Sequence, residues 1–179
     1  MQSENEFMNQ TNDVNWEAVY WTQMPRIYNF FRYRLGNNQL AQDLTATTFE
    51  KAWRSREQYR RDRGAFETWL FSIARNTAND HFRSHQPHEL SLDEAHTVAS
   101  NFSVEDESWR RQLFAQLYQL LEKLPRREKE LIALKYGSGL TNRDIAVLTQ
   151  LSESNVGTLL HRIIQKLRKE WESTYEPTI

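Results

Sequence analysis

The stretch from Leu140 to Arg168 constrains this chain most, because its apolar residues repeat with the period of an α-helix. The pattern predicts two helices joined by a tight turn. Thr141, with Asp144 three residues later, has the form of a capping box, and Ser152 suits the start of the second helix. The stretch is therefore predicted to be a helix-turn-helix.

The second helix of this stretch has one apolar and one polar face. Its apolar residues recur at i, i+3, i+4 and i+7 from Val156 to Trp171, which predicts one buried stripe. In a DNA-recognition helix, polar residues near the N-terminus contact base edges and basic residues nearby bind phosphates. The polar face of this helix, opposite the apolar stripe, has the same order of residues. The solvent-exposed face of an ordinary helical hairpin is the alternative. The polar face consists of Ser154, Thr158, His161, Arg162, Gln165 and Lys169.

Composition predicts an all-α protein, since the 179 residues include only five glycines and four prolines between long helical patterns. The chain has no cysteine, which excludes disulfides and thiolate metal sites and fits a reducing cytoplasm. No apolar run approaches the ~18 residues of a membrane span. Three of the five histidines, His81, His85 and His88, cluster only loosely at a helix end beside the expected linker, and no glycine-rich phosphate loop is present, so we expect no metal, no cofactor and no catalysis.

The charge of the chain is distributed unevenly. The net charge of −1 is not that of a protein that binds nucleic acid unaided. Residues 89–107 contain six acids and no lysine or arginine, whereas twelve basic residues face eight acids from Arg110 onward. Basic surfaces are therefore expected, with DNA binding assisted by a larger partner.

Two helical domains are expected, with breaks at proline and glycine. Pro25 is expected to break the first helix, Pro87 to end the first domain, and residues 137–139 to end a helix that Pro125 opens. The expected parts are a disordered segment 1–13, a domain 14–87, a flexible acidic linker 88–108 and a domain 109–179. The helices of the first domain are expected at about 14–35, 40–54 and 66–84.

Three polar segments of the first domain each allow a functional and an ordinary interpretation. The outer face of helix 40–54 is either solvated or a docking surface for a protein partner, while Phe49 and Trp53 flank its inner face. The arginine-rich loop 55–65 suits single-stranded nucleic acid, with Tyr59 as a stacking residue, or is simply solvated. On helix 66–84, asparagine and arginine side chains can contact bases, or Asn76 and Asp80 join neighbouring helices.

The whole pattern resembles the extracytoplasmic-function (ECF) group of bacterial RNA polymerase sigma factors. Three motifs in order carry the resemblance: AQDLTATTFEKAW at 41–53, FETWLFSIARNTANDHFR at 66–83, and the segment from LEKLPRRE at 121 through residue 168. They are similar to sigma region 2.2, regions 2.3–2.4 and region 4. The chain differs from the family pattern at Ala46 and Thr47, where Gln and Glu are usual, and at Gly157, Leu159 and Ile164, where relatives often have basic residues.

The resemblance implies a non-enzymatic transcription initiation factor. Such a protein binds the β and β′ subunits of core RNA polymerase, recognises the promoter −10 and −35 elements and assists strand opening. It also implies an anti-sigma factor as antagonist, which could hold this cytoplasmic protein at the membrane. A stand-alone helix-turn-helix regulator, which would bind duplex DNA as a dimer without polymerase, is the alternative.

The resemblance also assigns site residues. For core polymerase they are Asp43, Thr47, Glu50 and Arg54. For the −10 element they are Tyr59, Arg60, Arg61, Arg63, Asn76, Asn79, Asp80 and Arg83, with an extruded base held by the loop. For the −35 element they are Thr141, Ser154, Asn155, Thr158, His161 and Arg162.

Overall fold

The computed structural model of the protein describes residues 14–84 and 104–175. Within these two stretches the chain is helical apart from turns and short connections, and none of it is in a strand. The all-α prediction is therefore confirmed. The expected disorder of residues 1–13 and the greater part of the expected linker, its residues 88–103, lie outside the described residues.

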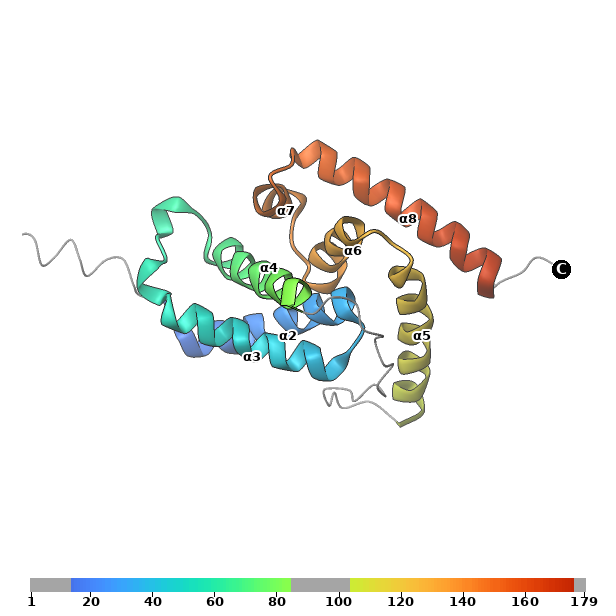
Figure 1. Ribbon diagram of the computed structural model, residues 1–179, viewed down its shortest axis with the longest axis horizontal. Coiled ribbons are helices and arrows are strands. Elements are labelled where there is room, and N and C mark those ends of the chain that lie inside the picture. The colour runs from blue at the N-terminus through green and yellow to red at the C-terminus, as the bar shows by residue number, and fades with distance from the viewer. Residues whose placement is uncertain (1–13, 85–103, 176–179) are drawn as a thin grey trace, which may run out of the picture.

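The helices form an N-terminal and a C-terminal group, which lie side by side (Figure 1). The N-terminal group consists of α2 (Trp16–Leu35), α3 (Asn38–Arg54), the 3-10 turns η1 (Arg56–Gln58) and η2 (Arg61–Arg63), and α4 (Phe66–Ser84). The C-terminal group consists of α5 (Val104–Glu122), α6 (Arg126–Ile132), the π-helical turn η3 (Ala133–Gly137), α7 (Asn142–Thr149) and α8 (Glu153–Tyr175).

Two predicted boundaries are wrong. Helix α2 continues through Pro25. Proline has no backbone N–H to donate to the carbonyl of Trp21. Both residues lie on the exposed side of the helix, where water can donate to that carbonyl instead. Helix α5 begins at Val104, inside the range expected as linker. The acidic sequence there suits a helix start, since the helix dipole favours negative charge at its N-terminus.

The predicted helix starts of the C-terminal group are confirmed by their hydrogen bonds. The Thr141 hydroxyl accepts from the backbone N–H of Asp144, and the Asp144 carboxylate accepts from the N–H of Thr141, so both halves of the capping box form. The Ser152 hydroxyl accepts from the N–H of Asn155 at the start of α8. Between the two helices, Gln150 takes the left-handed conformation with φ 57°, which makes the turn tight.

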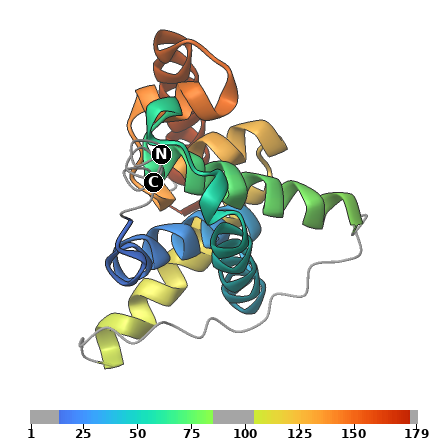
Figure 2. The same ribbon diagram turned by 90° about the vertical axis from the view of Figure 1, so that its left-hand side faces the viewer.

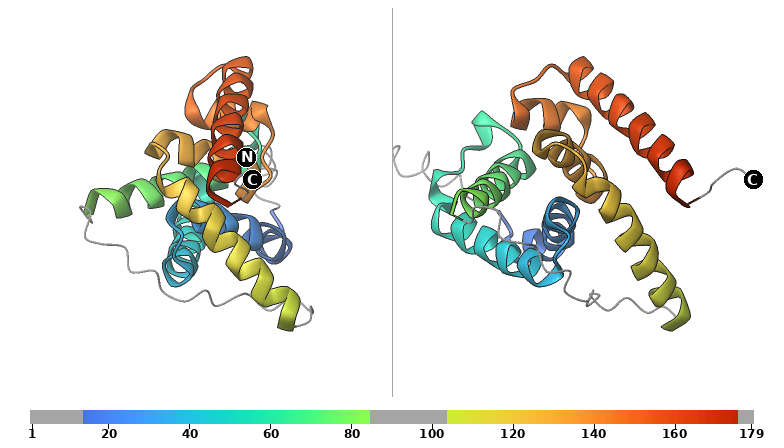
Figure 3. Two further views of the ribbon diagram at one scale, coloured as in Figure 1. Left: turned by 90° about the vertical axis from the view of Figure 1, so that its right-hand side faces the viewer. Right: turned by 45° about the vertical axis from the view of Figure 1, so that its right-hand side comes forward.

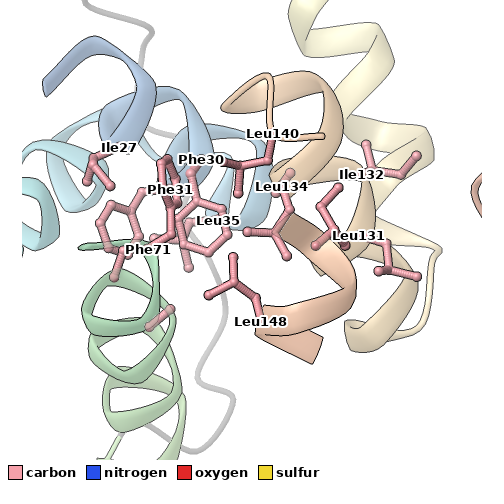
Figure 4. Close-up of a cluster of buried hydrophobic side chains, with 14 of the residues drawn as sticks. Ile27, Phe30, Phe31, Leu35, Phe71, Leu131, Ile132, Leu134, Leu140 and Leu148 are labelled. Atoms are coloured by element: carbon pink, nitrogen blue, oxygen red, sulfur yellow. The ribbon is translucent and has the colours of Figure 1, made fainter. Parts of the chain in front are cut away.

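The two groups share one hydrophobic core, which the sequence analysis did not predict. Figure 4 shows Phe30 and Leu35 of α2 beside Leu134 of η3, with Leu140 and Leu148 from the segment around α7. All five side chains are buried. Helix α4 packs against α3 on one side and α7 on the other (Figure 2), so the two groups are joined along α2 and α4.

The corner between α2 and α3 generates a prediction about Gly36. Gly36 ends α2 with φ 72°, and an added Cβ would lie 1.9 Å from the ring of Tyr118 on α5. The left-handed backbone costs a non-glycine residue ~1–2 kcal/mol, and the clash adds to it. We expect Gly36→Ala to lower the free energy of unfolding by at least about 2 kcal/mol, measured by urea denaturation.

The control for this substitution is Gly157→Ala. Gly157 lies inside α8 in helical conformation, and the atom nearest to an added Cβ would be Nδ2 of Asn142 at 3.5 Å. The variant should gain about 0.5–1 kcal/mol, because alanine favours the helix interior over glycine. Equal destabilisation by both substitutions would contradict the role of Gly36.

Candidate nucleic-acid interface

The outer face of α3 presents an exposed charged stripe. The opposite side of the helix is buried through Ala41, Thr48 and Ala52, which orients Asp43 and Glu50 toward solvent. The carboxylate of Glu50 is 2.6 Å from the guanidinium of Arg54 in an exposed i,i+4 pair, and the hydroxyl of Thr47 donates to the carbonyl of Asp43. Such an exposed pair adds little to stability, so these charges are available to a partner.

The connection between α3 and α4 is ordered by Tyr59. Its side chain is only 6% exposed, and its ring centroid lies 5.2 Å from that of Phe66 and 5.4 Å from that of Trp69. Its hydroxyl donates to the carbonyl of Gly64 at 3.3 Å. In this conformation the ring is covered by the protein and is not open to stack on a base. The structure thus gives Tyr59 a role in fixing the loop.

One arginine of this connection lies against an aromatic ring that the sequence analysis did not assign to the site, and two others are exposed. The guanidinium of Arg56 lies 4.4 Å from the ring centroid of Trp53, which is 50% exposed although it was expected to flank the inner face. Arg60 pairs with Asp62 at 3.2 Å, and Arg61 is exposed. The side chain of Arg63 lies outside the described residues. A cation stacked on an exposed indole suits unpaired nucleic acid.

Some predicted residues on the polar face of α4 are exposed, and some contact neighbouring helices. Asn76 and Arg83 are exposed, as is Asp80, which pairs with Lys51 of α3 at 3.4 Å. Asp80 thus joins neighbouring helices, as the ordinary interpretation of this face held. Asn79 is half-buried, and its side-chain oxygen accepts from Arg34 of α2 at 2.8 Å.

The predicted residues before α7 and along α8 are all exposed, and those of α8 share one face of that helix. The apolar stripe of α8 is buried through Val156, Leu160, Ile163 and Leu167, which confirms the predicted amphipathic helix. Helix α8 lies at the outer edge of the C-terminal group, and α7 lies between its N-terminal end and α4 (Figures 1 and 3). The exposed predicted residues are Thr141, Ser154, Asn155, Thr158, His161 and Arg162.

The described parts of the chain contain no group of three or more His, Asp or Glu side chains placed to hold a metal ion. Each helix in the same two stretches is too short or too polar to cross a membrane.

Comparison with known proteins gives two family matches in the same order as the two helical groups. Residues 21–88 match the model for sigma-70 region 2, and residues 114–167 match the model for sigma-70 region 4. The RNA polymerase sigma-H factor of Pseudomonas aeruginosa is 30% identical over 151 residues, which cover 79% of this chain and 76% of that protein.

Two further similar proteins were found. The ECF RNA polymerase sigma factor BldN of Streptomyces coelicolor is 28% identical over 146 residues, which cover 80% of this chain but only 55% of BldN. A solved structure of the sigma factor RpoE in complex with the anti-sigma factor NepR from Bartonella quintana aligns with a TM-score of 0.64 at 18% identity. That alignment covers 87% of this chain and 95% of the other and supports the fold.

The burial of Tyr59 leads to a prediction that distinguishes two contributions to stability, the packing of the ring and the hydrogen bond of the hydroxyl. Replacement by alanine removes a buried aromatic ring and should lower the free energy of unfolding by ~3 kcal/mol. Replacement by phenylalanine removes only the hydrogen bond to Gly64 and should cost no more than about 1 kcal/mol. Thermal denaturation of the two variants checks this. If Tyr59→Ala unfolded at the wild-type temperature, the ring would not hold the loop.

Proposed function

This chain belongs to the sigma-70 family, in its ECF group, and we propose that it binds core RNA polymerase and directs it to specific promoters. The family consists of transcription initiation factors rather than catalytic enzymes. The observation that carries the proposal is α8, whose apolar stripe is buried while its predicted DNA face is wholly exposed. An exposed helix face with polar residues ahead of cations fits the major groove.

In this proposal each exposed surface binds one partner. The stripe of Asp43, Thr47, Glu50 and Arg54 on α3 contacts core polymerase. The arginine-rich connection and the exposed part of α4 contact the −10 element as its strands separate. The polar face of α8 reads the −35 element. The net charge of −1 accords with this division, because polymerase supplies much of the binding energy and brings the two DNA-reading surfaces to one promoter.

Control by an anti-sigma factor is part of the proposal. Its support is the similarity in fold to RpoE, which was solved in complex with the anti-sigma factor NepR. We place the action of this chain in the cytoplasm, where RNA polymerase works. A membrane-bound antagonist would hold it at the membrane.

Run-off transcription tests the proposed function directly. Purified chain added to core polymerase on a library of genomic promoter fragments should yield discrete transcripts that core polymerase alone does not make. The start sites should follow a shared pair of −10 and −35 sequences. If no transcript rose above the level of core polymerase alone, the chain would not be an initiation factor.

Arg162 provides a test of the reading face. A bidentate arginine–base contact is worth ~1–3 kcal/mol, so Arg162→Ala should lower transcription from a −35-dependent promoter by about tenfold. Arg168→Ala is the matched control, since this exposed arginine lies six residues later and about 120° around the same helix. It should stay within about twofold of wild type. Equal losses in both variants would indicate general charge attraction instead of base recognition.

A further inference from the structure

The outer ends of α2 and α3 expose aromatic side chains to which the proposed function assigns no partner. The two helices run in opposite directions, so the first turns of α2 lie beside the last turns of α3 (Figure 1). Trp21 is 64% exposed and Trp53 is 50% exposed, and Tyr20, whose ring centroid lies 5.0 Å from that of Phe49, is exposed as well. Tyr20, Trp21 and Trp53 form an aromatic patch, and exposed apolar side chains that gather in one place mark an interaction site.

Ring contacts join the aromatic patch to the arginine-rich connection between α3 and α4. The ring of Trp16 on α2 lies edge-on to that of Trp53, with the centroids 5.4 Å apart. The same ring lies 5.6 Å from that of Phe66, which in turn packs on the buried ring of Tyr59. Trp53 is therefore the exposed edge of a continuous aromatic layer that orders this connection.

Arg56 adds a positive charge to the aromatic patch. Its guanidinium lies 4.4 Å from the ring centroid of Trp53, and it donates to the backbone carbonyl of the same residue at 2.9 Å. Its ion pair with the exposed Glu57 is 3.7 Å long, which leaves the charge available to a phosphate. An indole stacked with a guanidinium offers planar surfaces to a base and a cation to the nucleic-acid backbone.

Charge complementarity favours a strand of nucleic acid over an apolar protein segment as the occupant of the aromatic patch. Residues 55–65, which follow Trp53 directly, contain four arginines and two acids, so they attract a phosphate backbone. The sequence analysis expected Tyr59 to stack on a base here. Because that ring is covered, the exposed ring of Trp53 beside the same arginines is the one open to a base.

We propose that the aromatic patch and Arg56 form a stacking platform for unpaired bases that adjoin the −10 element. Its place in transcription initiation rests on the proposed function, whereas its affinity for single-stranded DNA does not. Stacking requires no particular base, so the platform holds the separated strand without reading its sequence. Adjacent residues of a helix point about 100° apart, so Trp53 lies beside the charged stripe of Arg54 and not on it.

Binding of a labelled oligothymidylate of about twelve nucleotides to the full chain tests the platform without polymerase. Fluorescence anisotropy at low salt should show that Trp53→Ala weakens binding by about tenfold, because a stacked base is lost. Trp53→Phe keeps a stacking ring and should stay within about threefold of wild type. Trp109→Ala, which removes another exposed indole from α5, is the matched control and should leave the affinity unchanged.

A second variant leaves every aromatic ring in place. Arg56→Gln should weaken binding of the same strand, and it should reduce the slope of log affinity against log salt concentration by ~0.7, the value for one phosphate contact. Circular dichroism checks that the variants keep wild-type helix content, and if Trp53→Ala loses helix content, Arg56→Gln decides. Wild-type affinity in either variant when it is folded, or no binding of the strand by the wild type, would overturn the platform.

Open promoter complexes test the role of the platform in initiation. A premelted promoter with 2-aminopurine at the unpaired positions that flank the −10 element loses fluorescence where the base stacks. Holoenzyme with the wild-type chain or Trp109→Ala should quench this signal, and holoenzyme with Trp53→Ala should quench it less. If Trp53→Ala weakened binding to core polymerase and left the affinity for oligothymidylate unchanged, the aromatic patch would be a protein-docking surface and the platform would be overturned. Absence of any transcript with the wild-type chain would instead refute the proposed function, while the oligothymidylate titration would still decide whether the platform exists.

Discussion

The placement of region 4 against region 2 depends on the carboxylate of Glu130 between Arg34 and Arg75. A buried charge is costly unless it is paired and hydrogen-bonded, so α6 can lie against α2 and α4 only where both guanidiniums reach this oxygen. The apolar contacts of Phe30 with the segment of Leu134 and Leu140 complete the same interface (Figure 4). Hydrophobic burial supplies the attraction, and the buried charges restrict the regions to one register.

A single helix of this chain can have one buried face that packs in the core and one exposed face that is available to DNA. On α8, the stripe through Val156 and Leu160 is buried, while Ser154 and Arg162 stay exposed. On α4 the division is less complete, since part of its polar face holds the two regions together and the rest is exposed. The same helix thus packs against region 4 and carries candidate DNA contacts.

The sequence was sufficient for features that depend on local chemistry. The capping box at Thr141, the stripe of α8 and the all-α class follow from periodicity and side-chain type, and all are confirmed. The packing of region 4 on region 2 could not be predicted, because Arg34 and Glu130 are 96 residues apart and each resembles an ordinary surface charge in its own helix. Tyr59 was taken for a stacking residue because an aromatic among arginines has the same pattern whether its ring is exposed or buried.

The central claim is that this chain reads promoter DNA only as a subunit of polymerase. Fluorescence anisotropy of a labelled promoter duplex, titrated with the chain alone and with the chain plus core polymerase, tests it most directly. The account predicts no sequence-specific binding by the chain alone and specific binding, lost on scrambling either element, once core polymerase is present. Tight, sequence-specific binding of the duplex by a dimer of the chain without polymerase would contradict the account and favour a stand-alone regulator.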